Sequence, residues 1–408
     1  MSNQQAFAGS RQATSSFGLF CLASYLLSMS YGTTFLLSLL IGARGGSEAD
    51  TGSVLSIAMV STFAAVVLSG HVSDAMGTTC AIACSGALLG LACVGFTLMP
   101  ATWLGFGACA LILGLGWGTF YTLGPINVAM MVPPAHRARH FAVLSGCMMA
   151  GIGSGPLIGR VVTASGLALP LAFDIAAIAS LLGAALFWWL TPGLALRSEG
   201  IEGRAGGVPG HRLSWAACVS VGRSRAVFPI IMVGLSACIF GGLSSFQTSY
   251  AQLKQLDYAL FFIGFMCAAI ACRLFIARLV VKRDAYLASC VLSAVMVVSV
   301  LMLMFFVVTP LGYLIAALTL GTGYGLTYSV INGLVVQESP PGVTSQALLL
   351  FSLAYFVGVF GFPWIAGKLI VHWGVTAFLA VVLGIALANW LITVLRLRWR
   401  ALQNSTQL

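Results

Sequence analysis

Long apolar runs, separated by short polar breaks, make up most of the chain. A helix needs about 20 apolar residues to cross the hydrocarbon core of a bilayer. Twelve runs are of roughly this length, and they cover residues 17–42, 52–70, 79–99, 102–131, 141–164, 169–191, 227–252, 257–280, 286–308, 310–337, 344–371 and 373–395. We therefore predict an all-α polytopic membrane protein with twelve transmembrane helices.

One polar stretch, rich in arginine and glutamate, divides these runs into six and six. The predicted parts are an N-terminal tail (1–16), a first six-helix bundle (17–191), a linker (192–226), a second six-helix bundle (227–395) and a C-terminal tail (396–408). Such a division predicts two bundles that each build their own helix contacts, with the linker outside the membrane.

Lysine and arginine are distributed unevenly between the two sides of the predicted bundle. With an even number of spans, the tails, the linker and alternate loops share one side. That side holds 14 of the 19 basic residues: Arg11, Arg137, Arg139, Arg197, Arg204, Arg212, Arg223, Arg225, Arg278, Lys282, Arg283, Arg396, Arg398 and Arg400. The opposite loops hold only Arg44 and Lys254. Because basic residues concentrate in cytoplasmic loops, we predict that both termini are cytoplasmic.

A segment of the first half returns in the second half. Residues 113–134, LGLGWGTFYTLGPINVAMMVPP, reappear at 320–341 as LGTGYGLTYSVINGLVVQESPP, an offset of 207 (320 − 113). The matched positions include three alternating glycines and a tyrosine in each copy, namely Gly114, Gly116, Gly118 and Tyr121 against Gly321, Gly323, Gly325 and Tyr328. A chain that repeats at half its length contains two copies of one unit. In membrane proteins this arrangement is typical of transporters with their site between the halves.

The overall composition excludes a water-soluble domain. The chain is 60% hydrophobic and 7% charged, and its mean hydropathy is +1.02. Soluble domains carry about 25% charged residues. The net charge of +10 is spread through the breaks between apolar runs, so it does not form the clustered basic face of a nucleic-acid-binding protein.

Other classes of chemistry lack their signatures. The 11 cysteines lie mostly inside apolar runs and form no CxxC pair, and the five histidines are scattered, so we expect no metal and no cofactor. Without a cluster of His, Cys or carboxylates, an enzyme is not expected. The Walker pattern GxxxxGK[ST] does not occur, so ATP is not expected to drive the protein directly.

Two short motifs resemble those of the major facilitator superfamily. GHVSDAMG at 70–77 resembles its loop motif G-x-x-x-D-R-x-G-R-K/R, and GIGSGPLIG at 151–159 resembles a motif of its antiporter members. The resemblance extends over the whole chain, and YFVGVFGFPWIAGKLIVHWG in span eleven is similar to bacterial efflux-type members. The resemblance implies two pseudo-symmetric halves. Ala75, Thr78 and Thr79 replace the basic residues of the loop motif, and span four lacks the arginine of many proton antiporters.

Aromatic and polar residues deep in the spans are the candidate substrate site. Trp117 and Tyr324 fall near the midpoints of spans four and ten, with Tyr121 and Tyr328 one turn toward the cytoplasm. Aromatic belts lie at the membrane surface, so rings at this depth serve another purpose. The resemblance implies that spans one, four, seven and ten line the cavity. The predicted substrate-binding residues are Trp117, Tyr121, Tyr324, Tyr328, Tyr31, Gln247 and Asn332. The alternative is that this segment serves only close packing of glycine-rich helices.

Three charged residues in or beside the spans are candidates for ion coupling. Asp174 is the only acidic residue well inside an apolar run, and Arg160 lies across a short turn from it. Either the two form a structural ion pair, or Asp174 carries the coupling proton, because burial raises the pKa of a carboxyl group. Lys368 is expected to extend to the membrane surface, or else to face the cavity.

Further residues are expected to take part in the movement of the two halves against each other. We place Gly70, Asp74, Gly77, Arg273 and Asp284 in or beside gating loops. The resemblance implies a structural Arg273 that contacts the loop after span eight. Gly155, Pro156 and Pro363 are predicted helix kinks, because proline removes a helix hydrogen bond. Either the kinks allow the two halves to rock against each other, or they are static bends in the helices.

These patterns favour a secondary transporter that moves a small organic solute by alternating access. Proton-coupled efflux by antiport is the favoured version. Import of an organic anion or a siderophore-like compound is the alternative, followed by a non-transporting sensor on the same fold. The expected partners are the small-molecule substrate, protons and the lipid bilayer, without nucleic acid. We expect a monomer in the bacterial inner membrane.

Overall fold

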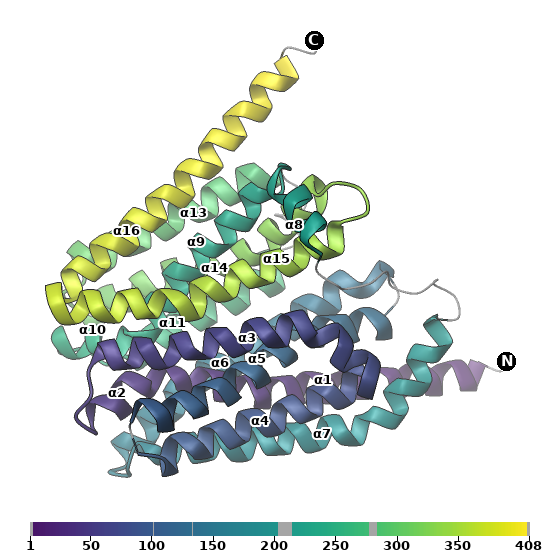
Figure 1. The fold of residues 1–408 in the computed structure, drawn as a ribbon, viewed down its shortest axis with the longest axis horizontal. Helices are drawn as coiled ribbons and strands as arrows, with labels where there is room; N and C mark the ends of the chain where they lie inside the picture. The colour runs from purple at the N-terminus through teal and green to yellow at the C-terminus, as the bar shows by residue number, and fades with distance from the viewer. Residues whose placement is uncertain (1–2, 101, 133, 203–213, 277–283, 406–408) are drawn as a thin grey trace.

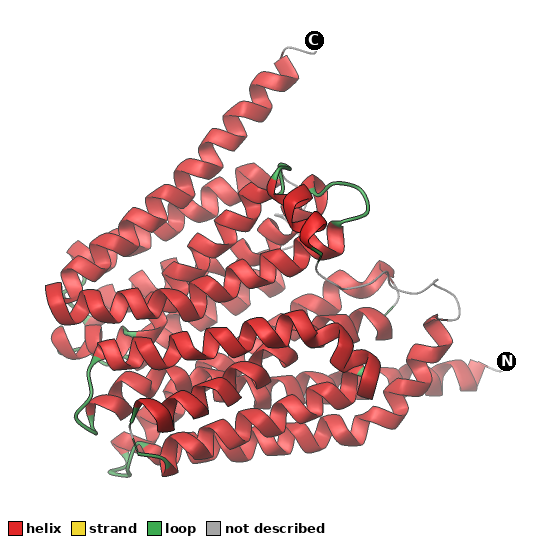
Figure 2. Cartoon of the chain, viewed as in Figure 1, coloured by secondary structure: helices red, strands yellow, loops and turns green. Residues whose placement is uncertain are grey.

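The computed structural model describes residues 3–100, 102–132, 134–202, 214–276 and 284–405. Within these ranges the regular structure is helical, with no strand (Figure 2). The predicted linker residues 203–213 and the basic residues Arg278, Lys282 and Arg283 lie outside the described part of the chain.

The first group of helices runs from α1 to α7. It consists of α1 (Asn3–Thr33), the 3₁₀ turn η1 (Thr34–Leu36), α2 (Leu37–Gly42), α3 (Glu48–Met76), α4 (Thr78–Leu98), α5 (Trp103–Met131), α6 (Pro134–Ala164) and α7 (Pro170–Glu202). Helix α7 therefore continues beyond residue 192, where the linker was expected to begin.

The second group runs from α8 to α16 and contains three π-helical segments. It consists of α8 (Trp215–Gly222), α9 (Val227–Ser245), α10 (Gln247–Leu253), α11 (Ala259–Ala271), η2 (Cys272–Ile276), α13 (Ala285–Leu301), η3 (Met302–Phe306), α14 (Pro310–Glu338), α15 (Thr344–Phe356), η4 (Val357–Gly361) and α16 (Phe362–Ser405). Helix α8 lies within the expected linker.

The described helices include eleven segments that are long and apolar enough to cross a membrane. The last segment, Thr344–Arg400, has 57 residues, and its Gly374 is not helical (φ 81°, ψ 171°). A straight helix of that length would reach about 86 Å, against a hydrocarbon core of about 30 Å. A turn at Gly374 agrees with the two spans expected in this region, and the total of twelve stays a prediction.

The two groups lie side by side with their helices roughly aligned (Figure 1). They meet where α3 packs against α15, η4 and α16, and where α6 packs against α11. Both chain termini lie at the same end of the bundle, which we call the terminal end. Helices α2 and α10 lie at the opposite end, which we call the distal end. The predicted orientation places the terminal end in the cytoplasm.

The repeated glycines make matching contacts in the two groups. On α5, Gly114 and Gly118 face α3, while Gly116 faces α4, with no room for a Cβ atom at Gly114. The matching residues of α14 face α11 and α13 in the same pattern, and these are Gly321, Gly325 and Gly323. Small residues let membrane helices approach closely. The alternating glycines thus pack α5 and α14 against two neighbours each.

The two predicted kinks occupy different kinds of contact. Gly155, next to Pro156 in α6, touches the backbone of α1 within the first group. Pro363, at the start of α16, has its carbonyl oxygen against Gly52 of α3, so it lies where the two groups meet. Pro363 is therefore placed directly at the contact between the groups.

Candidate functional site

Aromatic rings from both helix groups gather in one cluster at their contact. We call it the central aromatic cluster. Its members are Tyr31 of α1, Trp117 and Tyr121 of α5, Phe240 of α9, Tyr324 and Tyr328 of α14, Tyr355 and Phe356 of α15, and Phe360 of η4. Five of them were predicted from the sequence, and the rings of α9, α15 and η4 were not.

Each group contributes a stacked pair that includes a ring of its glycine-rich helix. Tyr31 stacks on Trp117 with ring centroids 4.4 Å apart and an interplanar angle of 11°. Phe240 stacks on Tyr324 at 4.7 Å and 17°. The pair joins α1 to α5 in the first group and α9 to α14 in the second, and Trp117 and Tyr324 are matching positions of the sequence repeat.

Tyr121 of the first group contacts two rings of the second group. Its ring stacks on Tyr355 at 5.4 Å and 9°, and meets Tyr328 edge-on at 6.1 Å. Trp117 and Tyr324, the matching positions of the repeat, each stack within their own group. Tyr121 and Tyr355 thus form a stacked contact between the halves, as Phe35 and Phe262 do at 5.6 Å and 13°.

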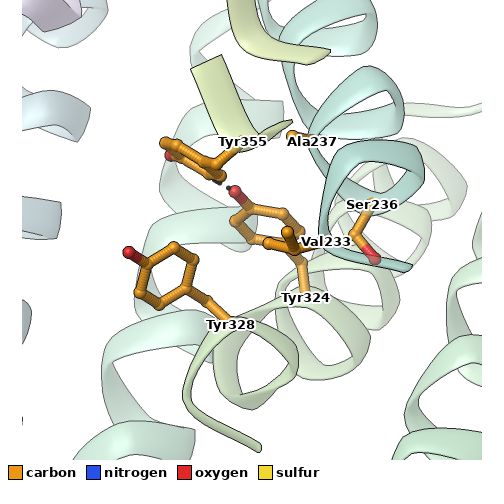
Figure 3. Close-up of a pocket in the computed structure, with 6 residues that line it drawn as sticks. All are labelled: Val233, Ser236, Ala237, Tyr324, Tyr328 and Tyr355. Carbon is orange, nitrogen blue, oxygen red and sulfur yellow. Dashed lines mark hydrogen bonds between the residues drawn. The ribbon is translucent and has the colours of Figure 1, made fainter. Parts of the chain in front are cut away.

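A narrow pocket opens beside these rings in the second group (Figure 3). It is lined by Val233, Ser236, Ala237, Tyr324, Tyr328 and Tyr355, with an empty volume of about 150 Å³. The hydroxyl of Tyr324 donates a hydrogen bond to that of Tyr355 over 3.5 Å. The lining side chains leave no room in it for a water-sized sphere. Drug-sized ligands occupy pockets of about 300–1,000 Å³, so such a solute must displace some of the rings.

Two other predicted substrate residues lie outside this pocket. The Gln247 side-chain amide donates a hydrogen bond to the Tyr313 hydroxyl over 2.7 Å, in the buried interior of the second group. Asn332 is half-buried on α14, two turns beyond Tyr324. Neither residue lines the pocket.

Arg273 lies in the interior rather than in a gating loop. It belongs to the π-helical segment η2, and only 6% of the residue is exposed. Its Nε donates to the Gly325 carbonyl oxygen over 2.8 Å, and its Nη1 donates to the Ser145 carbonyl oxygen over 3.3 Å. These bonds tie Arg273 to α14 and to α6 of the other group, and the loop after span eight, its expected partner, lies outside the described residues.

The expected pair between Arg160 and Asp174 is wrong. Arg160 Nε donates to Asp257 Oδ2 over 2.6 Å, and this ion pair joins α6 to the connection between α10 and α11. Asp257 was missed because it lies in a short loop of the other half of the sequence. Asp174 is half-buried near the start of α7, close enough to Cys93 of α4 for an electrostatic interaction.

Lys368 lies on an exposed face of α16. Its Nζ sits 3.7 Å from the centre of the Trp364 ring, one turn earlier on the same helix. Both residues are exposed, so the side chain points away from the contact between the groups. This placement suits a lysine that extends to the membrane surface, and it differs from the cavity-facing alternative.

The predicted gating residues lie near the terminal end. Asp74 is exposed in the last turn of α3, with Gly70 one turn earlier, and Gly77 follows with φ 82°, a conformation that favours glycine. Asp284 caps α13 by accepting from the backbone N–H groups of Tyr286 and Leu287, and it forms an ion pair with Arg400 at 3.3 Å. This pair stays within the second group.

The distal end is closed by contacts between the groups. The hydroxyls of Ser38 and Thr248 are hydrogen-bonded there, and the Arg160–Asp257 pair lies close by. A Cβ atom at Gly52 of α3 would overlap the backbone of α16, and a Cβ atom at Gly367 of α16 would overlap the backbone of α3. At the terminal end, the ion pairs of the described residues stay within the second group.

The described residues contain no group of three or more His, Cys, Asp or Glu side chains that could hold a metal ion. The candidate functional features are the central aromatic cluster, the buried Arg273 and the ion pair between the groups.

Comparison with known proteins gives a consistent result. The family model of the Major Facilitator Superfamily matches residues 17–363. Uncharacterized MFS-type transporters of Burkholderia mallei and Burkholderia pseudomallei are 25% identical over 341 residues, covering 78% of this chain and 79% of theirs.

Solved structures share the fold at low sequence identity. The human organic anion transporter MFSD10 has a TM-score of 0.67 at 16% identity, covering 93% of this chain and 99% of its own. The proton:xylose symporter XylE has a TM-score of 0.68 at 15% identity, covering 93% of this chain and 95% of its own.

Proposed function

The chain belongs to the major facilitator superfamily, and we propose that it is a secondary transporter that moves a small organic solute by alternating access. Proton-coupled efflux across a bacterial inner membrane is the favoured version. Import of an organic anion or a siderophore-like compound is the alternative.

The observation that carries this proposal is the position of the central aromatic cluster. Tyr121 of the first group and Tyr355 of the second group stack directly on each other where the groups meet. A solute bound at this seam contacts both groups, so its binding depends on their relative position. Amphipathic rings bury an organic ligand and also offer hydroxyls for hydrogen bonds.

Alternating access requires that the distal end opens when the terminal end closes. Exposed positions for spin labels are Leu98 and Leu253 near the distal end, and Met76 and Leu287 near the terminal end. We would replace the native cysteines, label each pair and measure both distance distributions by double electron–electron resonance. We expect two populations whose distal and terminal distances change in opposite directions. A single fixed distance at both ends, in detergent and in nanodiscs, would contradict the proposal.

Transport itself is tested by counterflow in proteoliposomes. A carrier accelerates uptake of labelled solute when unlabelled solute is loaded inside, whereas a channel does not. The probes are ethidium, chloramphenicol and 2-naphthoate, which are cationic, neutral and anionic. Acceleration with any of them supports a carrier. Opening of the distal end without counterflow of any probe favours the sensor.

Asp174 is the proposed proton carrier of the efflux version. The pairing of Arg160 with Asp257 leaves Asp174 without that cation as its partner, and Asp174 is the only acidic residue well inside an apolar run. We expect Asp174→Asn to abolish solute-driven proton movement, measured with pyranine inside proteoliposomes, while counterflow persists. Asp50→Asn is the control at an exposed site. Unchanged proton movement in Asp174→Asn removes this residue from the mechanism.

A further inference from the structure

We propose that Arg273 and the surrounding tyrosines form an anion-binding site, so that the transported solute carries an acidic group on an aromatic or apolar body. This inference rests on the proposed function and names the substrate class. The hydroxyl-bearing residues are Tyr121, Tyr324, Tyr328 and Tyr355. Tyr324 directly precedes Gly325, whose carbonyl oxygen accepts from Arg273 Nε, and the rings of the other three contact one another.

The charge of Arg273 has no acidic partner among the described side chains. The ion pairs of the described residues use Asp257, Glu338 and Asp284, each with a different arginine. The other acidic side chains that the structure describes are Glu48, Asp50, Asp74 and Asp174, and none of them bonds to Arg273. A buried charge is costly inside a membrane and usually marks a functional site.

The bonds that Arg273 does make orient it without neutralising it. Nε and Nη1 donate to the carbonyl oxygens of Gly325 and Ser145, and a carbonyl carries no net charge. Guanidinium has five N–H donors in a planar fork that matches a carboxylate or a phosphate. Gly325 lets this geometry form, because α14 approaches the Ala269 backbone of α11 closely at this point.

The tyrosines supply the rest of such a site. Neutral phenols donate hydrogen bonds to an anion but cannot cancel its charge, and their rings stack on a planar body. Tyr324 and Tyr355 already bring their hydroxyls together in the pocket (Figure 3). A cationic solute, in contrast, would meet the guanidinium without any described carboxylate to balance it.

Two π-helical segments flank the site. Arg273 lies in η2, and η4 begins two residues after Tyr355. Single π-turns within α-helices occur frequently at functional sites, because the extra residue redirects side chains at a cost in regular hydrogen bonding. The π-helical backbone is an observation independent of the charge of Arg273, and it also marks this region as a functional site.

Matched pairs of acids and amides test the proposal. The radiolabelled probes are benzoate, 2-naphthoate and indole-3-acetate, each against its uncharged amide, in equilibrium dialysis with purified protein in nanodiscs. We expect at least one acid to bind about tenfold or more tightly than its amide, as charge-assisted hydrogen bonds imply. Arg273→Gln should remove the preference, while Arg398→Gln at an exposed site should keep it.

Three outcomes would overturn the inference. These are equal binding of acids and amides, a preference that survives in Arg273→Gln, and the absence of binding by all three acids. Arg273→Lys keeps the charge and guards against a folding defect, so it should retain part of the preference. If the distal end opens and a neutral or cationic probe shows counterflow, the inference fails while the proposed function stands. Fixed distances at both ends would defeat the proposed function itself.

Discussion

Trp117 and Tyr121 lie one helical turn apart on α5, but their surroundings differ. Trp117 is only 1% exposed and stacks on Tyr31 of the same group, whereas Tyr121 is half-buried and contacts the other group. A residue enclosed within one group supports the wall of the pathway. A residue at the seam between the groups is placed to touch a solute.

Trp117→Ala should therefore destabilise the protein instead of only weakening solute binding. Removing a fully buried Trp leaves a cavity and costs about 3–5 kcal/mol in the free energy of unfolding. We expect a clearly lowered thermal unfolding midpoint in detergent, with a smaller decrease for Trp117→Phe. Tyr121→Phe keeps the ring and serves as the control at the seam. An unchanged midpoint in Trp117→Ala would show that the indole does not fill the core as described.

Some residue roles could be predicted from the sequence and others could not. The depth of Tyr121 and Tyr328 follows from their positions within long apolar runs, and the structure brings both into the cluster. The partner of Arg160 is 97 residues away, in the other half of the sequence. Proximity in sequence favoured Asp174, but packing of the two groups determines the pairing. Tyr355 was missed because no repeated pattern marks it.

At the scale of helices, the repeat predicted which elements correspond. The expected spans 102–131 and 310–337 agree closely with α5 (Trp103–Met131) and α14 (Pro310–Glu338). The breaks within spans were not predicted, including the 3₁₀ turn at Thr34–Leu36 and the π-helical segments. Such breaks depend on contacts with neighbouring helices, and hydrophobic patterns do not record them.

Replacement of two glycines of α14 by alanine should change the stability of the protein in different ways. A Cβ atom at Gly321 would overlap the Phe265 carbonyl of α11, whereas nothing lies within 4 Å of a Cβ atom at Gly333. Overpacking costs about 1–3 kcal/mol, so Gly321→Ala should lower the thermal unfolding midpoint. Gly333→Ala should hold or raise it, because alanine is favoured over glycine in a helix by about 0.5–1 kcal/mol. Equal effects at both positions would contradict the close contact of α14 with α11.

At the scale of the whole molecule, the contacts between the groups are asymmetric. The distal end is held by the Arg160–Asp257 pair and by close contact of α3 with α16. The described ion pairs nearer the terminal end join residues of the second group only. The charge pattern of the sequence predicts which end is cytoplasmic, but it does not reveal which end is closed, because the closing pair forms only when the two groups meet.

The Arg160–Asp257 pair should act as a latch on the distal end. Its side chains are 42% and 36% exposed, so solvent screens and weakens the attraction between the two charges. Arg160→Gln should therefore shift the balance toward a distal-open state by at most about fivefold. Spin labels at Leu98 and Leu253 measure this shift as a larger share of long distances.

A matched control separates the latch from a general loss of charge. Arg400 and Asp284 form a pair of similar exposure, 42% and 47%, but both lie in the second group. Arg400→Gln should leave the distal distances unchanged, because its pair does not cross the seam. The exchange Arg160→Asp with Asp257→Arg should restore the original distribution, since it keeps the attraction with reversed sign. If Arg160→Gln and Arg400→Gln shift the distances equally, the pair is not a latch and the helix contacts alone close the distal end.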